Sequence, residues 1–204
     1  MDQRLLANIH RAEKMHQLVS EQLSGAHSGG VRIVLAATFI SVAMSHHKSI
    51  LVLLQDDGLV GSAFALFRPL VEAIYRGLFT AFLANDSQVE MIRIGEASYP
   101  RFSELAKSLD GMLNADGFFS AYSGKTWSTL CGYTHTGLEQ LCQRIDSNAT
   151  IRANYDLTNV NQMVNSSTAV LVVGALSLLE LEGKQQAWRV VSERYMTLFR
   201  VETS

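Results

Sequence analysis

Four polar side chains follow one another at helical spacing in an otherwise apolar stretch: Arg68, Glu72, Tyr75 and Arg76. On a helical wheel Glu72 and Arg76 lie about 40° and about 80° to one side of Arg68, and Tyr75 lies about 20° to the other. Charges buried without partners cost several kcal/mol, so these groups must pair, line a wet cavity or meet a ligand. A structural salt-bridge network and a functional site both fit this pattern.

Pro69 follows the first of these arginines and cannot donate a backbone hydrogen bond. Within a helix it also clashes with the preceding turn. We therefore expect a kink near residues 65–68, which frees a backbone carbonyl beside Arg68.

A second polar group is the run Tyr133-Thr134-His135-Thr136, which glycines bracket inside an apolar helical pattern. Such a run predicts a local break with polar atoms pointing inward, and His is the side chain best suited to proton transfer near neutral pH. A helix junction with a satisfied core histidine is the alternative.

These patterns give two sets of candidate site residues. The candidate catalytic residues are His135, Arg68 and Glu72, and the candidate ligand-binding residues are Arg76, Tyr75, Tyr133, Thr134 and His47. His47 lies on the apolar face of its helix, where a satisfied core residue is the more common outcome. The spacing Cys131, His135, Glu139 supplies too few ligands for a tetrahedral metal site, so we expect neither a metal nor a cofactor.

The composition favours one domain of long, mostly buried helices. The 204 residues are 48% hydrophobic and 18% charged and include two prolines, which excludes a disordered chain or a small disulfide-held scaffold. The formal net charge is −2, and no run of Lys or Arg gives a strong DNA-binding signature.

Helical periodicity and turn residues divide the chain into an N-terminal helix (2–24), a bundle core (about 30–84 and 125–182) and a C-terminal helix (about 184–199). Between them, residues 86–124 are polar and irregular, with short helices near 88–94 and 100–110, and we expect a lid there. The predicted fold is all-α: an antiparallel four- to five-helix bundle with this irregular helical lid, forming a single domain over 1–204.

The location and assembly are predicted from the apolar segments. The longest uncharged apolar stretches, 33–47 and 168–179, are shorter than the roughly 20 residues that span a bilayer. The N-terminus lacks a secretory pattern. We therefore expect a cytoplasmic protein without a membrane partner, and the many apolar helix faces favour a homodimer.

Two motifs, Arg-Pro-Leu-x-Glu-Ala-x-x-Arg at 68–76 and Tyr-Thr-His-Thr-Gly at 133–137, resemble a family of uncharacterised bacterial helical proteins related to the HEPN superfamily (higher eukaryotes and prokaryotes nucleotide-binding). The resemblance covers roughly residues 30–182. It implies an antiparallel helical bundle that dimerises, and a superfamily in which many members are toxin or anti-phage ribonucleases that use an Arg and a His. In this chain His135, on another segment, would supply the imidazole.

Two functions follow. The first is a non-catalytic binding or scaffold module with a buried Arg/Glu/His polar site, which takes RNA or a small anionic ligand. The second is a metal-independent ribonuclease or nucleotide-acting toxin or defence enzyme, in which Arg68 and Arg76 hold phosphate, His135 is the general acid or base, and Glu72 and Tyr133 orient them.

Overall fold

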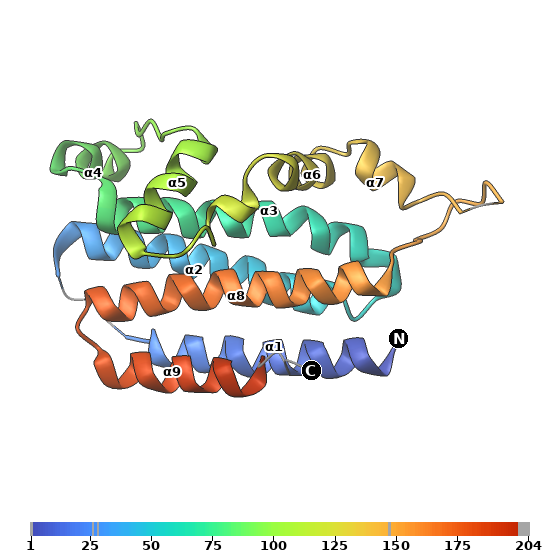
Figure 1. Cartoon of the computed structure of the whole chain (residues 1–204), viewed down its shortest axis with the longest axis horizontal. Helices are drawn as coiled ribbons and strands as arrows, with labels where there is room; N and C mark the ends of the chain where they lie inside the picture. The colour runs from blue at the N-terminus through green and yellow to red at the C-terminus, as the bar shows by residue number, and fades with distance from the viewer. Residues whose placement is uncertain (1, 26, 28, 147, 200–204) are drawn as a thin grey trace.

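The structure of the protein is a computed structural model that describes residues 2–25, 27, 29–146 and 148–199 (Figure 1). Over these ranges the chain is helical and forms no strand; one isolated antiparallel bridge joins Ile145 and Ile151. The predicted all-α class is confirmed. Residues 26 and 28, between the predicted N-terminal helix (2–24) and the predicted bundle core (from about 30), lie outside the described residues.

The helices fall close to the predicted segments. They are α1 (Gln3–Gln22), α2 (Gly30–Leu53), the 3₁₀ turn η1 (Asp57–Leu59), α3 (Val60–Leu78) with its π-helical end η2 (Phe79–Leu83), α4 (Asp86–Arg93), α5 (Phe102–Leu113), the 3₁₀ turn η3 (Ser120–Tyr122), α6 (Lys125–Thr134), α7 (Leu138–Cys142), α8 (Leu157–Leu181) and α9 (Gln185–Leu198). The local break predicted at Tyr133-Thr134-His135-Thr136 separates two helices, α6 and α7.

The long helices stack in layers, and α3 lies between the bundle and the shorter helices. Figure 1 shows α1 beside α9 at one side, α2 and α8 in the middle, and α4–α7 arranged along α3 at the opposite side. The pair α2 and α3 has the most extensive contact. Gly77 permits this approach, because a Cβ there would lie 3.1 Å from Phe39 Cβ and 3.3 Å from the Ala36 carbonyl oxygen.

The buried apolar side chains of α1, α2, α3 and α8 belong to one core cluster, which continues into the lid through Leu105, Leu109 and Phe119. On α3 the buried positions alternate with the half-buried Arg68, Glu72 and Arg76. The helix therefore has its apolar sides in the core and presents this row to the lid side of the bundle.

The lid over residues 86–124 is present, with α4 and α5 as its helices, and Tyr75 fastens it to α3. The Tyr75 hydroxyl donates to the Phe119 carbonyl at 2.7 Å, and its ring stacks on Phe102 with centroids 4.7 Å apart. The Asp110 carboxylate accepts from the backbone N–H groups of Phe119 and Ser120 at 2.8 and 2.9 Å. The Tyr75 contacts hold the lid against α3, and the Asp110 bonds fix the segment around Phe119 to α5.

Arg32 of α2 closes the π-helical end of α3. Its guanidinium donates to the carbonyls of Thr80 (2.9 Å) and Ala84 (2.6 Å) and to the Asp86 carboxylate (2.8 Å). Carbonyls at a helix end lack intrahelical donors, and a cation there is also favoured by the helix dipole. Arg32 thus fixes the point at which the chain leaves α3 for the lid.

Three helical segments of the described chain are long and apolar enough, by length and composition alone, to cross a membrane: Gly30–Leu53, Asp57–Leu83 and Leu157–Leu181. The expectation that no segment reaches that length counted only uncharged runs, whereas these helices include isolated charges. Cytoplasmic location therefore stays a prediction.

Candidate functional site

The two polar motifs meet where α6 crosses α3 at Pro69. This proline lies inside α3, which continues through it as α-helix. Its missing N–H leaves the Ala65 carbonyl without the donor four residues on. The Thr134 hydroxyl lies 3.3 Å from that carbonyl and 2.9 Å from the Leu130 carbonyl of its own helix. The expected free carbonyl beside Arg68 is therefore present, and it receives a donor from the second motif.

The backbone break after Thr134 sets the direction of His135. The N–H of Gly137 donates to the Gly132 carbonyl at 2.6 Å, and Thr136 has a left-handed φ of 55°. The Glu139 side chain lies directly against the Gly132 Cα, where any Cβ would clash with it. The two glycines thus permit the tight turn between α6 and α7, at the local break that the sequence predicts.

This turn at the end of α6 brings the His135 imidazole to the Arg68 guanidinium. Nη1 of Arg68 lies 2.6 Å from Nε2 of His135. A guanidinium can only donate, so Nε2 must be the accepting, unprotonated nitrogen, and the proton of the neutral ring sits on Nδ1. The lone pair that a general base would offer is thereby occupied.

Glu72 and Arg76 complete a row of charges along α3. The Glu72 carboxylate accepts from Arg76 and lies 3.9 Å from Nη2 of Arg68. We call these three residues together with His135 the Arg68 cluster. Two guanidinium groups face one carboxylate, so the cluster has a formal charge of +1 with His135 neutral.

Two aromatic rings cover the flat faces of these guanidinium groups. The Arg68 Cζ lies 5.1 Å from the Trp127 ring centroid, and the Arg76 Cζ lies 4.6 Å from that of Tyr99. Such stacking fixes the guanidinium planes and leaves their N–H edges as the open sides. Sequence reasoning missed Trp127 and Tyr99; the only signal was an aromatic residue in each segment that flanks the row.

The Arg68 cluster is partly open to solvent, and its hydrogen bonds are incomplete. The side chains of Arg68, Glu72 and Arg76 are 21%, 30% and 40% exposed, and His135 is exposed. Nε of Arg68 is buried without a hydrogen-bond partner among the described residues. Most buried donors in folded proteins have a partner, and the described residues leave this one available.

Three predicted ligand-binding residues lie next to this cluster but have other contacts. Tyr75 is 1% exposed, burial raises the pKa of its hydroxyl, and it binds the lid as described. The Thr134 hydroxyl contacts the Ala65 carbonyl and so joins α6 to α3. Tyr133 stacks on Phe64, with centroids 4.7 Å apart. Tyr75 therefore lies beside the charged row, where it lines a small hollow with Glu72 and Arg76, but its hydroxyl is bonded to the lid.

The fourth, His47, lies elsewhere, fully buried between α1, α2 and α8. Its Nε2 is 3.1 Å from the Thr168 hydroxyl, and its Nδ1 is 3.2 Å from Nδ1 of His16. The Thr168 hydroxyl donates to the Val164 carbonyl, so it accepts from Nε2–H, and Nδ1 must then accept from His16. Burial lowers the pKa of His47 to about 3, with further lowering from His16 and Lys48. The structure satisfies both ring nitrogens internally and leaves none for a ligand.

Tyr133 instead lines a cavity of about 480 Å³ between α3, η3, α6 and α8. We call it the aromatic pocket; its lining residues are Phe64, Phe67, Phe118, Ala121, Tyr122, Thr126, Thr129, Leu130, Tyr133, Asn159, Gln162, Met163 and Ser166. It contains no residue of the Arg68 cluster. Sequence reasoning named Tyr133 alone among these residues.

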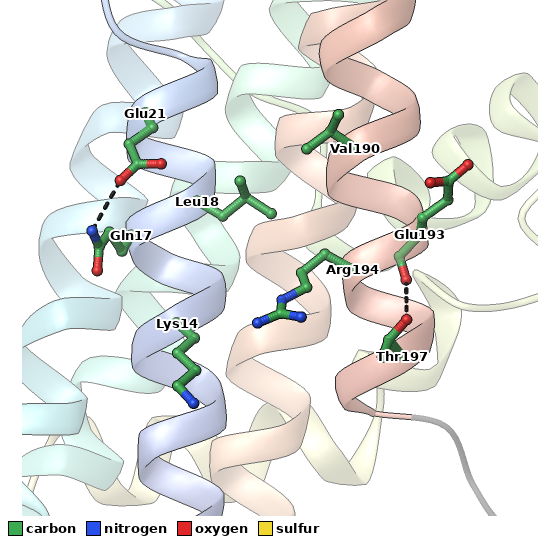
Figure 2. Close-up of a pocket in the computed structure, with 8 residues that line it drawn as sticks. All are labelled: Lys14, Gln17, Leu18, Glu21, Val190, Glu193, Arg194 and Thr197. Carbon is green, nitrogen blue, oxygen red and sulfur yellow. Dashed lines mark hydrogen bonds between the residues drawn. The ribbon is translucent and has the colours of Figure 1, made fainter.

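A second hollow, of about 590 Å³, lies between α1 and α9 and is lined mainly by polar residues of mixed charge (Figure 2). Arg194 points from α9 toward α1, while Gln17 donates to Glu21 at 2.9 Å within α1. Thr197 likewise bonds to Glu193 of its own helix, and the hollow is lined by side chains of both charges.

Metal-ligating residues do not gather in the described ranges: no three of His, Cys, Asp and Glu lie close enough together there to hold an ion. Cys131 and Cys142 are free thiols, and Cys142 is exposed.

Comparison with known proteins gives one match. A model of the family of unknown function DUF6988 matches residues 40–200, which include both polar motifs. No curated protein and no solved structure matches the chain. The expectation of an uncharacterised family is confirmed.

The buried His47 predicts a specific loss of stability in acid. A histidine whose pKa is about 3 when folded and about 6.5 when unfolded binds its proton mainly in the unfolded chain between those values. The free energy of unfolding should therefore fall with decreasing pH below about 6.5, by roughly 1 kcal/mol for each pH unit from this residue.

Urea unfolding of the wild type and His47→Gln from pH 7.5 to pH 4 measures how much His47 contributes to the pH dependence of the free energy of unfolding. The Gln amide can donate to Thr168 and accept from His16 but does not titrate, so the two stability curves should converge as the pH falls. Parallel curves would show that His47 does not resist protonation.

Proposed function

For this chain, which belongs to the family of unknown function DUF6988, we propose a non-catalytic binding or scaffold role in which the Arg68 cluster takes a small anionic ligand. The observation that carries the proposal is the convergence of two aromatic-stacked guanidinium groups and an exposed imidazole around a single carboxylate. The excess positive charge and the open N–H edges suit a carboxylate or phosphate group.

The absence of catalysis is argued from His135. Its Nε2 accepts from Arg68 at 2.6 Å, so a proton taken there requires the loss of that hydrogen bond. Protonation would also place a second positive charge against the guanidinium, with only Glu72 nearby to offset it. Arg68 and His135 thus suit recognition of an anion better than proton transfer.

Binding of inorganic phosphate tests this role. In wild-type protein, phosphate should raise the melting temperature relative to chloride at equal ionic strength, because a ligand that binds only the folded state stabilises it. Arg76→Gln, which removes a 40% exposed guanidinium, should abolish the increase without unfolding the protein.

Arg93→Gln is the matched control, since Arg93 likewise pairs with a glutamate of its own helix, Glu90, but lies outside the cluster. It should keep the full phosphate effect. An equal increase in all three proteins, or none in the wild type, would contradict an anion site at the cluster.

A second candidate, the metal-independent ribonuclease of HEPN type, is favoured by one observation. Arg68 and His135 come from distant segments, yet their side chains touch at the surface. Such a pair could hold a phosphate and serve a 2′-hydroxyl if His135 were released from Arg68. The HEPN relationship and a toxin or defence role belong to this second candidate.

RNA integrity after induced expression distinguishes the two functions. Under the binding proposal, RNA stays intact with the wild type and with His135→Ala, Arg68→Ala and the control His10→Ala, an exposed histidine of α1. Cleavage by the wild type and His10→Ala that disappears in the other two, with all four folded by circular dichroism, would overturn the binding proposal and establish the ribonuclease.

We also propose that the protein is a homodimer that pairs through α2. Only a third of the residues in the most apolar stretch of α2 are buried. Seven of its exposed residues repeat alternately every three and four positions, the spacing of a helix–helix seam: Val31, Val34, Thr38, Ser41, Ser45, Lys48 and Val52. Val42 and Ser49 are exposed beside this row. The small hydroxyl residues at its centre would let a second α2 approach closely.

Light scattering at micromolar concentration should give twice the chain mass for the wild type. Ser45→Arg should give the monomer mass, because a charged side chain would then occupy the centre of the seam. Ser128→Arg, an equally exposed serine on α6, should stay dimeric. A monomeric wild type, or a dimer unaffected by Ser45→Arg, would contradict pairing through α2.

A further inference from the structure

The aromatic pocket has the size and walls of a small-molecule site that is separate from the Arg68 cluster. Its volume of about 480 Å³ is roughly three times that of a 150 Å³ cavity that admits benzene, which leaves room for a ligand of two or three fused rings. Five of its lining residues are aromatic: Phe64, Phe67, Phe118, Tyr122 and Tyr133.

The aromatic rings are held in fixed orientations by one another. Tyr133 stacks on Phe64, and Phe64 in turn stacks on Tyr155 with centroids 5.6 Å apart. Tyr122 meets Phe67 and Phe118 edge-on at 6.0 and 5.8 Å. These contacts fix the positions of the rings that line the pocket, and a planar aromatic molecule can pack against them.

The pocket carries no charge to receive an ion. None of its lining residues in the described chain is Lys, Arg, His, Asp or Glu. Moving an ionised group into such surroundings without a partner is strongly unfavourable. The charge state of the ligand is therefore set by the walls: it must be neutral in the part that enters.

Polar groups lie along one side of the pocket, on α8. Asn159, Gln162 and Ser166 line it at spacings of three and four residues, so they share a helix face. Ser166 lies near Tyr122, whose hydroxyl has a pKa raised by burial. The amides of Asn159 and Gln162 are exposed and form no hydrogen bond with the described residues, so they can bind a polar group on the ligand edge.

From these features we propose that the aromatic pocket binds a neutral planar aromatic molecule with a hydrogen-bonding group on its edge. The rings enclose the flat body, and the two α8 amides bind the edge group at the mouth. This site acts independently of the anion site, because the two share no residue.

The test uses 2-naphthol as the probe and the methionine methyl groups as reporters. Met163 lines the pocket and is 3% exposed, whereas Met15 is buried in α1 at 0% exposure. In the full-length protein labelled at methionine methyls, 2-naphthol should shift the Met163 signal to saturation and leave Met15 in place. The anionic analogue 2-naphthalenesulfonate should bind at least tenfold more weakly.

Two adjacent hydroxyl residues of α6 give a matched pair of variants. Thr129→Phe fills the pocket and should abolish the Met163 shift, while Ser128→Phe, at an exposed position outside the lining, should leave it unchanged. The exposed pair Asn159→Ala/Gln162→Ala, which does not disturb the core, should weaken 2-naphthol several-fold.

The proposal is overturned if Met163 shows no saturable shift at millimolar 2-naphthol, if the sulfonate binds equally well, or if the shift persists in folded Thr129→Phe. If Thr129→Phe does not fold, unchanged affinity in the double alanine variant overturns the proposed recognition of the ligand edge.

Discussion

A proline in the middle of a core helix is the constraint on which the site depends. Pro69 takes away the donor that the Ala65 carbonyl needs, and a carbonyl left unpaired beside the core is costly. The Thr134 hydroxyl of α6 lies 3.3 Å from that carbonyl and shares its one proton between it and the Leu130 carbonyl at 2.9 Å. Once α6 is held there, the tight turn between Gly132 and Gly137 leaves His135 against Arg68, the residue just before the proline. One carbonyl without its helical donor thus joins two motifs that lie far apart in the sequence.

The same junction divides the surface beside α6 into two regions with different chemistry. The Arg68 cluster has charges, aromatic rings over its guanidinium faces and an unpaired buried donor. The aromatic pocket has rings and amides and no charge. Both are preformed, because the lid is bonded to α3 through Tyr75 and its exit point is fixed by Arg32. Preformed sites of this kind favour recognition, since ligand binding does not have to order the walls.

Local patterns predicted most of the fold and part of the site. Helical periodicity located the long helices, and the missing proline donor located the free carbonyl beside Arg68, because both depend on neighbours along the chain. The contacts of Tyr75 with the lid were not predicted: its ring stacks on Phe102, and its hydroxyl donates to Phe119. Likewise, the partners of His47, His16 and Thr168, come from other helices, and so do the α8 residues of the aromatic pocket. Contacts between elements decide these cases, and one sequence contains no record of them.

The most direct measurement of the junction is the protonation state of the two ring nitrogens of His135, read from ¹⁵N chemical shifts in a long-range ¹H–¹⁵N spectrum well above pH 6.5, where a free imidazole is neutral. We predict an unprotonated Nε2 and a proton on Nδ1, because Nε2 accepts from Arg68. In Arg68→Ala the ring should revert to the mixture of tautomers of an exposed histidine. A proton on Nε2 in the wild type would contradict the contact on which the site is built.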